Sequence, residues 1–229
     1  MEVSATVGFQ LAGAASGASS KRNPPATPRV PSRIGRSCRV VAIPFGIVER
    51  IAVSPSRYRN LGRSEARLGL QPIVRRVWAP VGERPSAHHC RRYQWVYTYG
   101  FVHPDTGARY FLLLPGASVS MMQMALELFA TEVNPRRQQL IILLVDQAAW
   151  HMSQKLQVPP GIFLYPLLPY TPQLQPTEYV WSLLREVVAN QAFDNLDALE
   201  DVLVKRCQWL MQHPSVVQGK VGFDWIQAI

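Results

Sequence analysis

The chain has 229 residues, of which 48% are hydrophobic, so it is long enough to bury one sizeable core and is expected to form one main domain. Its 24 Lys and Arg residues against 15 Asp and Glu give a formal net charge of +9, which favours a polyanionic partner such as nucleic acid over an acidic one. A basic surface without a specific ligand is an equal alternative. Three scattered cysteines with no Cys-x-x-Cys pair argue against a zinc site and a disulfide framework, and no apolar run approaches the roughly 18 residues of a membrane helix.

Residues 1–63 differ in composition from the rest of the chain. They are basic and rich in Pro, Ser and Gly, which is typical of disordered segments. A short apolar run at residues 40–47, interrupted by Pro44, could form one strand, but nothing resembles a helix-turn-helix. The sequence therefore predicts a flexible basic segment over residues 1–63 and a folded domain over residues 64–229.

A β-hairpin is predicted first within the folded domain. Residues 94–102 are aromatic and β-branched, residues 103–107 form a turn sequence with Pro and Gly, and residues 108–114 are apolar again. Apolar residues at helical spacing over 121–133 then predict an amphipathic helix against one face of the sheet.

The second half of the domain alternates strands and helices. The continuous apolar run 140–145 predicts a buried central strand, and residues 161–167 predict another. Pro176 occupies the place of a first helical residue, and a last helix is expected from near Asp194. This order predicts an α/β fold: a mixed sheet with helices on both faces.

Two carboxylates stand at ends of these elements. Asp146 directly follows the central strand, where ligands collect in open α/β sheets, and Glu178 lies in the first turn of the helix that starts at Pro176. Each has an ordinary alternative, since an Asp often ends a strand in a turn and a Glu often begins a helix.

Sequence blocks around these carboxylates resemble a known family. Residues 144–151 (Leu-Val-Asp-Gln-Ala-Ala-Trp-His) and 168–181 (Leu-Pro-Tyr-Thr-Pro-Gln-Leu-Gln-Pro-Thr-Glu-Tyr-Val-Trp) resemble the two hallmark blocks of the DDE endonuclease domain of bacterial insertion-sequence transposases, in the mariner-like superfamily. Weaker similarity begins near Arg67 and extends to the C-terminus, covering about two thirds of the chain. The resemblance implies a ribonuclease-H-like fold.

The resemblance also implies an activity. In that family two aspartates and one glutamate hold two Mg²⁺ (or Mn²⁺) ions for cleavage and joining of DNA strands, a reaction that suits hard cations with oxygen ligands. By position, Asp146 corresponds to the second carboxylate and Glu178 to the third. The implied partners are transposon-end and target DNA and a second copy in a homodimer, and the implied location is the bacterial cytoplasm at the nucleoid.

The first carboxylate of the family pattern is replaced. Ser64 stands where the family has Asp, and a serine hydroxyl is a neutral, weak metal ligand. The preceding residues 54–63 lack an apolar run, so we expect the first strand of the fold to be missing or degenerate. Glu65 is not expected to substitute, because neighbouring positions of a strand point to opposite faces. A frameshift, a fusion or a misassigned start could account for residues 1–63.

Four basic or histidine side chains are candidates for DNA contact: His151, Lys155, Arg75 and Arg76. The alternative for His151 is a structural hydrogen-bonding role, and for the other three a solvated surface position. Three interpretations of the whole chain remain: an endonuclease and strand transferase impaired at Ser64, a catalytically inactive DNA-binding remnant, or a product that does not fold because the missing strand exposes the sheet.

Overall fold

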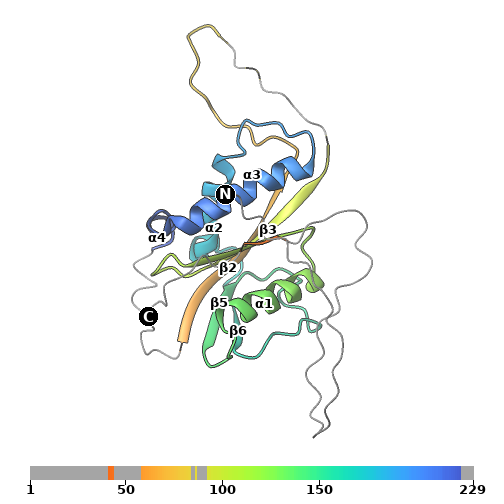
Figure 1. The fold of residues 1–229 in the computed structure, drawn as a ribbon, viewed down its shortest axis with the longest axis vertical. Coiled ribbons are helices and arrows are strands. Elements are labelled where there is room, and N and C mark those ends of the chain that lie inside the picture. The colour runs from red at the N-terminus through yellow and green to blue at the C-terminus, as the bar shows by residue number, and fades with distance from the viewer. Residues whose placement is uncertain (1–40, 44–57, 84–85, 87–91, 223–229) are drawn as a thin grey trace, which may run out of the picture. The chain divides into compact units, whose positions relative to one another are not determined.

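A computed structural model describes residues 41–43, 58–83, 86 and 92–222, which form a mixed sheet with helices on both faces (Figure 1). Within these residues the sheet has six strands in the order β1-β4-β3-β2-β5-β6. The pairs β1–β4, β4–β3 and β3–β2 are antiparallel, whereas β5 runs parallel to both β2 and β6. The bounds are β1 Val41–Ile43, β2 Tyr58–Gly69, β3 Trp95–Val102, β4 Arg109–Leu114, β5 Leu140–Val145 and β6 Ile162–Pro166.

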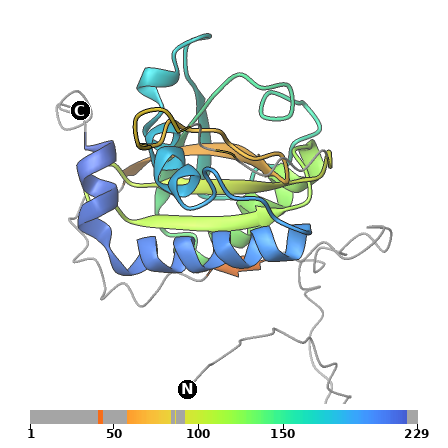
Figure 2. The same ribbon diagram turned by 90° about the horizontal axis from the view of Figure 1, so that it is seen from above.

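The described part of the chain also contains four α-helices and one short 3-10 helix: α1 Val119–Val133, η1 Pro172–Leu174, α2 Pro176–Glu186, α3 Leu196–Gln212 and α4 Pro214–Val221. Helix α1 packs on one face, and α2, α3 and α4 pack on the other. The single last helix that the sequence predicted is in fact two, because Pro214 cannot continue α3, and α4 turns away from the axis of α3 (Figure 2). No helix among the described residues is long and apolar enough to span a membrane.

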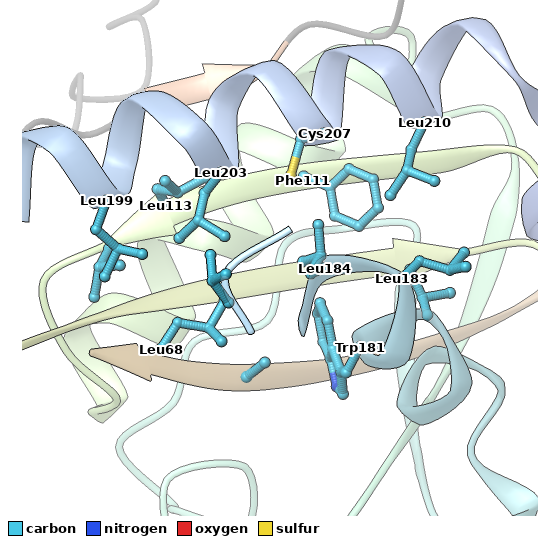
Figure 3. Packing of buried hydrophobic residues seen from close by; sticks show 14 of the residues in the cluster. Leu68, Phe111, Leu113, Trp181, Leu183, Leu184, Leu199, Leu203, Cys207 and Leu210 are labelled. Carbon is cyan, nitrogen blue, oxygen red and sulfur yellow. The ribbon is translucent and has the colours of Figure 1, made fainter. Parts of the chain in front are cut away.

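Two apolar cores result from the alternation of side chains along the strands. On β4, Phe111 and Leu113 face the helices α2 to α4, while Tyr110, Leu112 and Leu114 face α1. Figure 3 shows the first core, in which side chains of α3 and α2 meet those of the sheet. The hairpin, the first helix and the strand Leu140–Val145 are where the sequence predicted them.

The expectation that the first strand is missing is wrong. Strand β2 is twelve residues long and lies in the middle of the sheet between β3 and β5. It is hard to recognise in the sequence because its buried positions include polar and small residues as well as apolar ones: Leu61, Gly62, Arg63 and Ser64 are all buried. The boundary predicted between residues 63 and 64 falls inside this strand, and the sheet has no unpaired edge at this place.

Helix α2 approaches the sheet closely at two glycines. A Cβ at Gly100 would lie 2.7 Å from the Trp181 ring, and one at Gly62 would lie 2.9 Å from atoms of Gln175, Pro176 and Thr177. Both distances are shorter than ordinary contacts, so these glycines allow the N-terminal half of α2 to lie against β2 and β3. This packing brings the first turn of α2 next to the centre of the sheet.

Candidate functional site

Ser64 lies on β2, and Asp146 directly follows the end of the neighbouring parallel strand β5. The register pairs Gly62 with Leu144, and two residues further along each strand are Ser64 and Asp146. The buried side chain of Gln175 holds the strands together here, because its Nε2 donates hydrogen bonds to the carbonyl oxygens of Arg63, at 2.7 Å, and Leu144, at 3.0 Å. The fold thus delivers both positions to one point of the sheet.

Glu178 comes to the same point from α2. The helix begins at Pro176, which needs no N–H partner, and Glu178 lies in its first turn, where a negative charge is favoured. The hydroxyl of Ser64 donates a hydrogen bond to Oε1 of Glu178 at 2.5 Å, and the Trp181 indole N–H lies 3.4 Å from the Ser64 oxygen. Ser64 therefore sits beside Glu178, where the motif comparison expects the first carboxylate.

A pocket of about 500 Å³ opens at this point. Asp146 and Glu178 both line it, together with the segment that connects β6 to η1. The structure therefore brings together the two carboxylates that the sequence singled out, although they are 32 positions apart in the chain. The Asp146 side chain is 59% exposed, so it is accessible from the solvent.

His151 holds Asp146 from the interior. Its Nδ1 lies 2.6 Å from Oδ1 of Asp146, and this hydrogen bond is the main cause that lowers the pKa of Asp146 below its usual value. Burial and the nearby Arg63 oppose protonation of His151, but hydrogen bonds to Asp146 and Glu65 raise its pKa above the usual value. The ring has no exposed surface, so its contacts are with protein groups and not with solvent.

Arg63 and Glu65 form a buried ion pair on the face of β2 opposite Ser64. NH1 of Arg63 lies 2.9 Å from Oε2 of Glu65 and also contacts Nε2 of His151. Burial lowers the pKa of Arg63, and burial alone would raise that of Glu65, but His151 and Arg63 hold the Glu65 pKa below its usual range. Trp150 donates a 2.6 Å hydrogen bond to Oε1 of Glu65. The expectation that Glu65 points away from Ser64 is confirmed.

These residues do not fit a centre of two divalent ions. Such a centre needs several anionic oxygens around the ions. At the position of the first carboxylate the Ser64 hydroxyl acts as a hydrogen-bond donor to Glu178, which uses one of the oxygens that a metal would need. Within the described part of the chain, no group of three His, Cys, Asp or Glu side chains is arranged so that it could hold a metal ion.

The four candidates for DNA contact lie in different places. His151 is buried beside Asp146, and Lys155 is exposed on the connection from β5 to β6. Arg75 and Arg76 are exposed on the segment after β2, where the backbone N–H of Arg75 donates to Asn190 beyond the C-terminal end of α2. That end is remote from Glu178 in the first turn, so the structure does not place the two arginines at the pocket.

Sequence reasoning missed two residues of the site. Gln175 clamps β2 to β5, and only its position directly before the Pro176 helix start could have indicated a capping or bridging role. Arg63 is a buried cation within a strand, and the alternation of Arg63 and Glu65 was a possible signal for a pair on one face. Trp181 packs in the core, at 1% exposure, and is not among the residues that line the pocket.

Comparisons with known proteins agree with this geometry. An uncharacterized protein, y4pE/y4sA of Sinorhizobium fredii (strain NBRC 101917 / NGR234), is 35% identical over 114 residues, which cover 49% of this chain and 81% of that protein. Among solved structures, the Mos1 mariner paired-end complex with Mn matches with a TM-score of 0.52 and 15% identity over 71% of this chain. The match spans 53% of the Mos1 chain, about half its length. At this identity the likeness shows a common fold.

A family model assigns the chain directly. The model of the DDE superfamily endonuclease matches residues 65–200, which include Asp146, Glu178 and all of the pocket lining. This range is more than half of the 229 residues. The chain therefore belongs to the DDE superfamily endonuclease family, with the ribonuclease-H-like fold that its motifs predicted.

Proposed function

We propose that this chain is the catalytic domain of a transposase-type DNA endonuclease and strand transferase, with metal-dependent catalysis impaired by the serine at position 64. The observation that carries this proposal is the hydrogen bond from Ser64 to Glu178. It puts a neutral donor where the family pattern has an anionic ligand. Family membership supports the reaction class, and the altered ligand set supports the impairment.

The proposal assigns roles to the residues of the site. Asp146 and Glu178 are the remaining carboxylate ligands for Mg²⁺ or Mn²⁺, and His151 orients Asp146. Lys155, Arg75 and Arg76 contact DNA phosphates from exposed positions. The net charge of +9 supports DNA as the partner, as does the solved Mos1 neighbour, which is a paired-end complex with Mn. Assembly as a homodimer on bacterial chromosomal DNA completes the proposal.

A second candidate is a DNA-binding protein with no catalytic activity. The same hydrogen bond favours it, because Glu178 is engaged by Ser64 and Asp146 by His151. In this case the chain would occupy DNA or combine with an active relative, without cutting. The two candidates agree on DNA binding and differ in whether restoring one carboxylate restores cleavage.

Nicking of supercoiled plasmid in Mg²⁺ or Mn²⁺ separates these candidates. The proteins to compare are the unmodified chain, Asp146→Ala, Ser64→Asp, the neutral control Ser64→Asn, and Ser64→Asp combined with Asp146→Ala. We expect the single variant Ser64→Asp to nick the plasmid and the other proteins not to nick it. Nicking by the unmodified chain that Asp146→Ala abolishes would contradict the impairment, and DNA binding without nicking by any variant would favour the second candidate.

We further propose that the catalytic domain begins at or before Tyr58, because strand β2 pairs with β5 from Tyr58 onward. A separate part of this proposal is that the residues ahead of the catalytic domain derive from a frameshift, a fusion or a misassigned start. Translation of the upstream DNA in all three frames tests it. Transposase-like sequence in another frame would support a frameshift, and its absence from every frame would refute it.

A further inference from the structure

An exposed aromatic side chain stands at the mouth of the pocket. Tyr170 is 99% exposed, and Leu168 two residues earlier is 71% exposed. Both line the same pocket as Asp146 and Glu178. Other exposed apolar side chains of the described residues, such as Trp78, do not line this pocket, so it is the position of Tyr170 and Leu168 beside the two carboxylates that suggests a binding role.

The segment that carries Tyr170 is held in one shape. Thr171 donates a 2.6 Å hydrogen bond from its hydroxyl to the carbonyl of Leu168, and Gln147 donates a 2.9 Å bond to the carbonyl of Leu167. Pro169 and Pro172 each fix one backbone angle on either side. Gln147 directly follows Asp146, so these bonds tie the segment to the strand end that carries the carboxylate.

Tyr170 also has an unusual backbone conformation. Its φ is +60°, in the left-handed region that favours Gly and Asn and that a side chain such as tyrosine rarely adopts. Residues kept in such conformations cluster at binding and catalytic sites, because the neighbouring structure must hold them there. The strained backbone and the exposed ring are two independent observations at one residue.

The charges at the pocket narrow the choice of ligand. Among the described residues that line it, two are carboxylates and none is Lys or Arg. The two carboxylates therefore repel a phosphate at the pocket. A ligand that carries a phosphate can bind there only if another part of it makes favourable contacts with uncharged groups. Nucleobases provide such a part, since every base has a face that stacks on an aromatic ring.

We propose that Tyr170 is a positioning residue that stacks on an unpaired nucleobase of DNA and so holds the adjoining phosphodiester at the pocket of Asp146 and Glu178. Leu168 lines the same pocket and would act as an apolar support that keeps the base out of a duplex stack. This inference rests on the proposed function, because it takes DNA to be the substrate. It adds a preference for unpaired DNA and names the residue responsible.

The test measures binding of the full chain to a fluorescein-labelled 20-nucleotide oligothymidylate with one central 2-aminopurine, in EDTA. Tyr170→Gly removes the ring and also relieves the backbone at φ +60°, so folding is retained. Tyr170→Phe keeps the ring. Tyr93→Gly is the matched control, since Tyr93 is 72% exposed and does not line the pocket.

We expect Tyr170→Gly to weaken binding about tenfold, whereas Tyr170→Phe and Tyr93→Gly stay within about twofold of the unmodified chain. The 2-aminopurine fluorescence should fall on binding to the unmodified chain and to Tyr170→Phe, and should not fall with Tyr170→Gly. Equal binding by Tyr170→Gly and the unmodified chain, or an equal loss in Tyr93→Gly, would overturn the inference alone. If the unmodified chain binds neither this strand nor its duplex, the proposed function fails with it.

Discussion

Arg63 carries a positive charge in the interior of the sheet, with no exposed surface. Its partner Glu65 is also largely buried, so removal of the guanidinium leaves a buried carboxylate that has lost its arginine and keeps only His151 and Trp150 as partners. Breaking a buried pair from one side typically costs about 3–5 kcal/mol, whereas replacing both partners by apolar residues can be neutral. Arg63→Met should therefore lower the free energy of unfolding by about 3 kcal/mol, and Arg63→Met with Glu65→Leu should lower it less.

Urea denaturation measures both changes. Arg67→Met is the matched control, because Arg67 lies on the same strand but is exposed and stacks on the Trp95 ring. It should change the free energy of unfolding by less than about 1 kcal/mol. An equal loss in the two single variants would mean that the buried pair has no special role.

The contacts of His151 predict how stability depends on pH. The pKa values of Asp146 and Glu65 are lowered in the folded state, so their contribution is present above their unfolded values and is lost as the pH falls through the folded ones. The pKa of His151 is raised, so its contribution is full below about 6.5 and is lost as the pH rises through the folded value.

Stability from this network is therefore expected to be greatest between about pH 5 and 6.5. Thermal denaturation from pH 3 to 9 measures this stability. His151→Phe should remove the loss of stability at alkaline pH, whereas the loss at acidic pH that comes from the carboxylates should remain. An unchanged alkaline decline in His151→Phe would show that the histidine does not cause it.

At the scale of elements, the position of α2 depends on the glycines beneath it. A Cβ at Gly100 would lie 2.7 Å from the Trp181 ring and 3.0 Å from Thr177, and both side chains are buried with little room to move. Overpacking of this kind costs about 1–3 kcal/mol. Gly100→Ala should lower stability by that amount and also disturb the placement of Glu178, which lies on the same helix.

Gly116→Ala is the control for this prediction, because a Cβ there has no atom within 4 Å. It should change stability by less than about 0.5 kcal/mol. Differential scanning calorimetry of the two variants measures the change in stability of each. A Gly100→Ala protein as stable as Gly116→Ala would mean that α2 can shift on the sheet without loss.

At the scale of the whole molecule, the sequence predicted the elements whose side chains alternate or repeat regularly. The run Leu140–Val145, the hairpin and the helix at Pro176 all have strong local signals, and the structure confirms them. The carboxylates Asp146 and Glu178 could be paired only through family motifs, since the contact between their elements is not local.

Strand β2 escaped prediction because its stability comes from partners elsewhere in the chain. Arg63 is accommodated by Glu65, His151 and the Tyr99 ring, and Gly62 by the close approach of α2. Neither feature leaves an apolar pattern in residues 58–64. Long-range contacts of this kind override local propensity, which is why the strand and the Gln175 bridge became visible only in the folded structure.

The proposal that Ser64 prevents a working two-metal site is tested most directly by Mn²⁺ binding, measured by electron paramagnetic resonance. The unmodified chain and Ser64→Asn should bind Mn²⁺ weakly. Ser64→Asp should bind Mn²⁺ at least roughly tenfold more tightly, because even residues that only hydrogen-bond to metal ligands change metal affinity by about that factor. Tight binding of two Mn²⁺ ions by the unmodified chain, unchanged in Ser64→Asp, would contradict the proposal that Ser64 impairs the metal site.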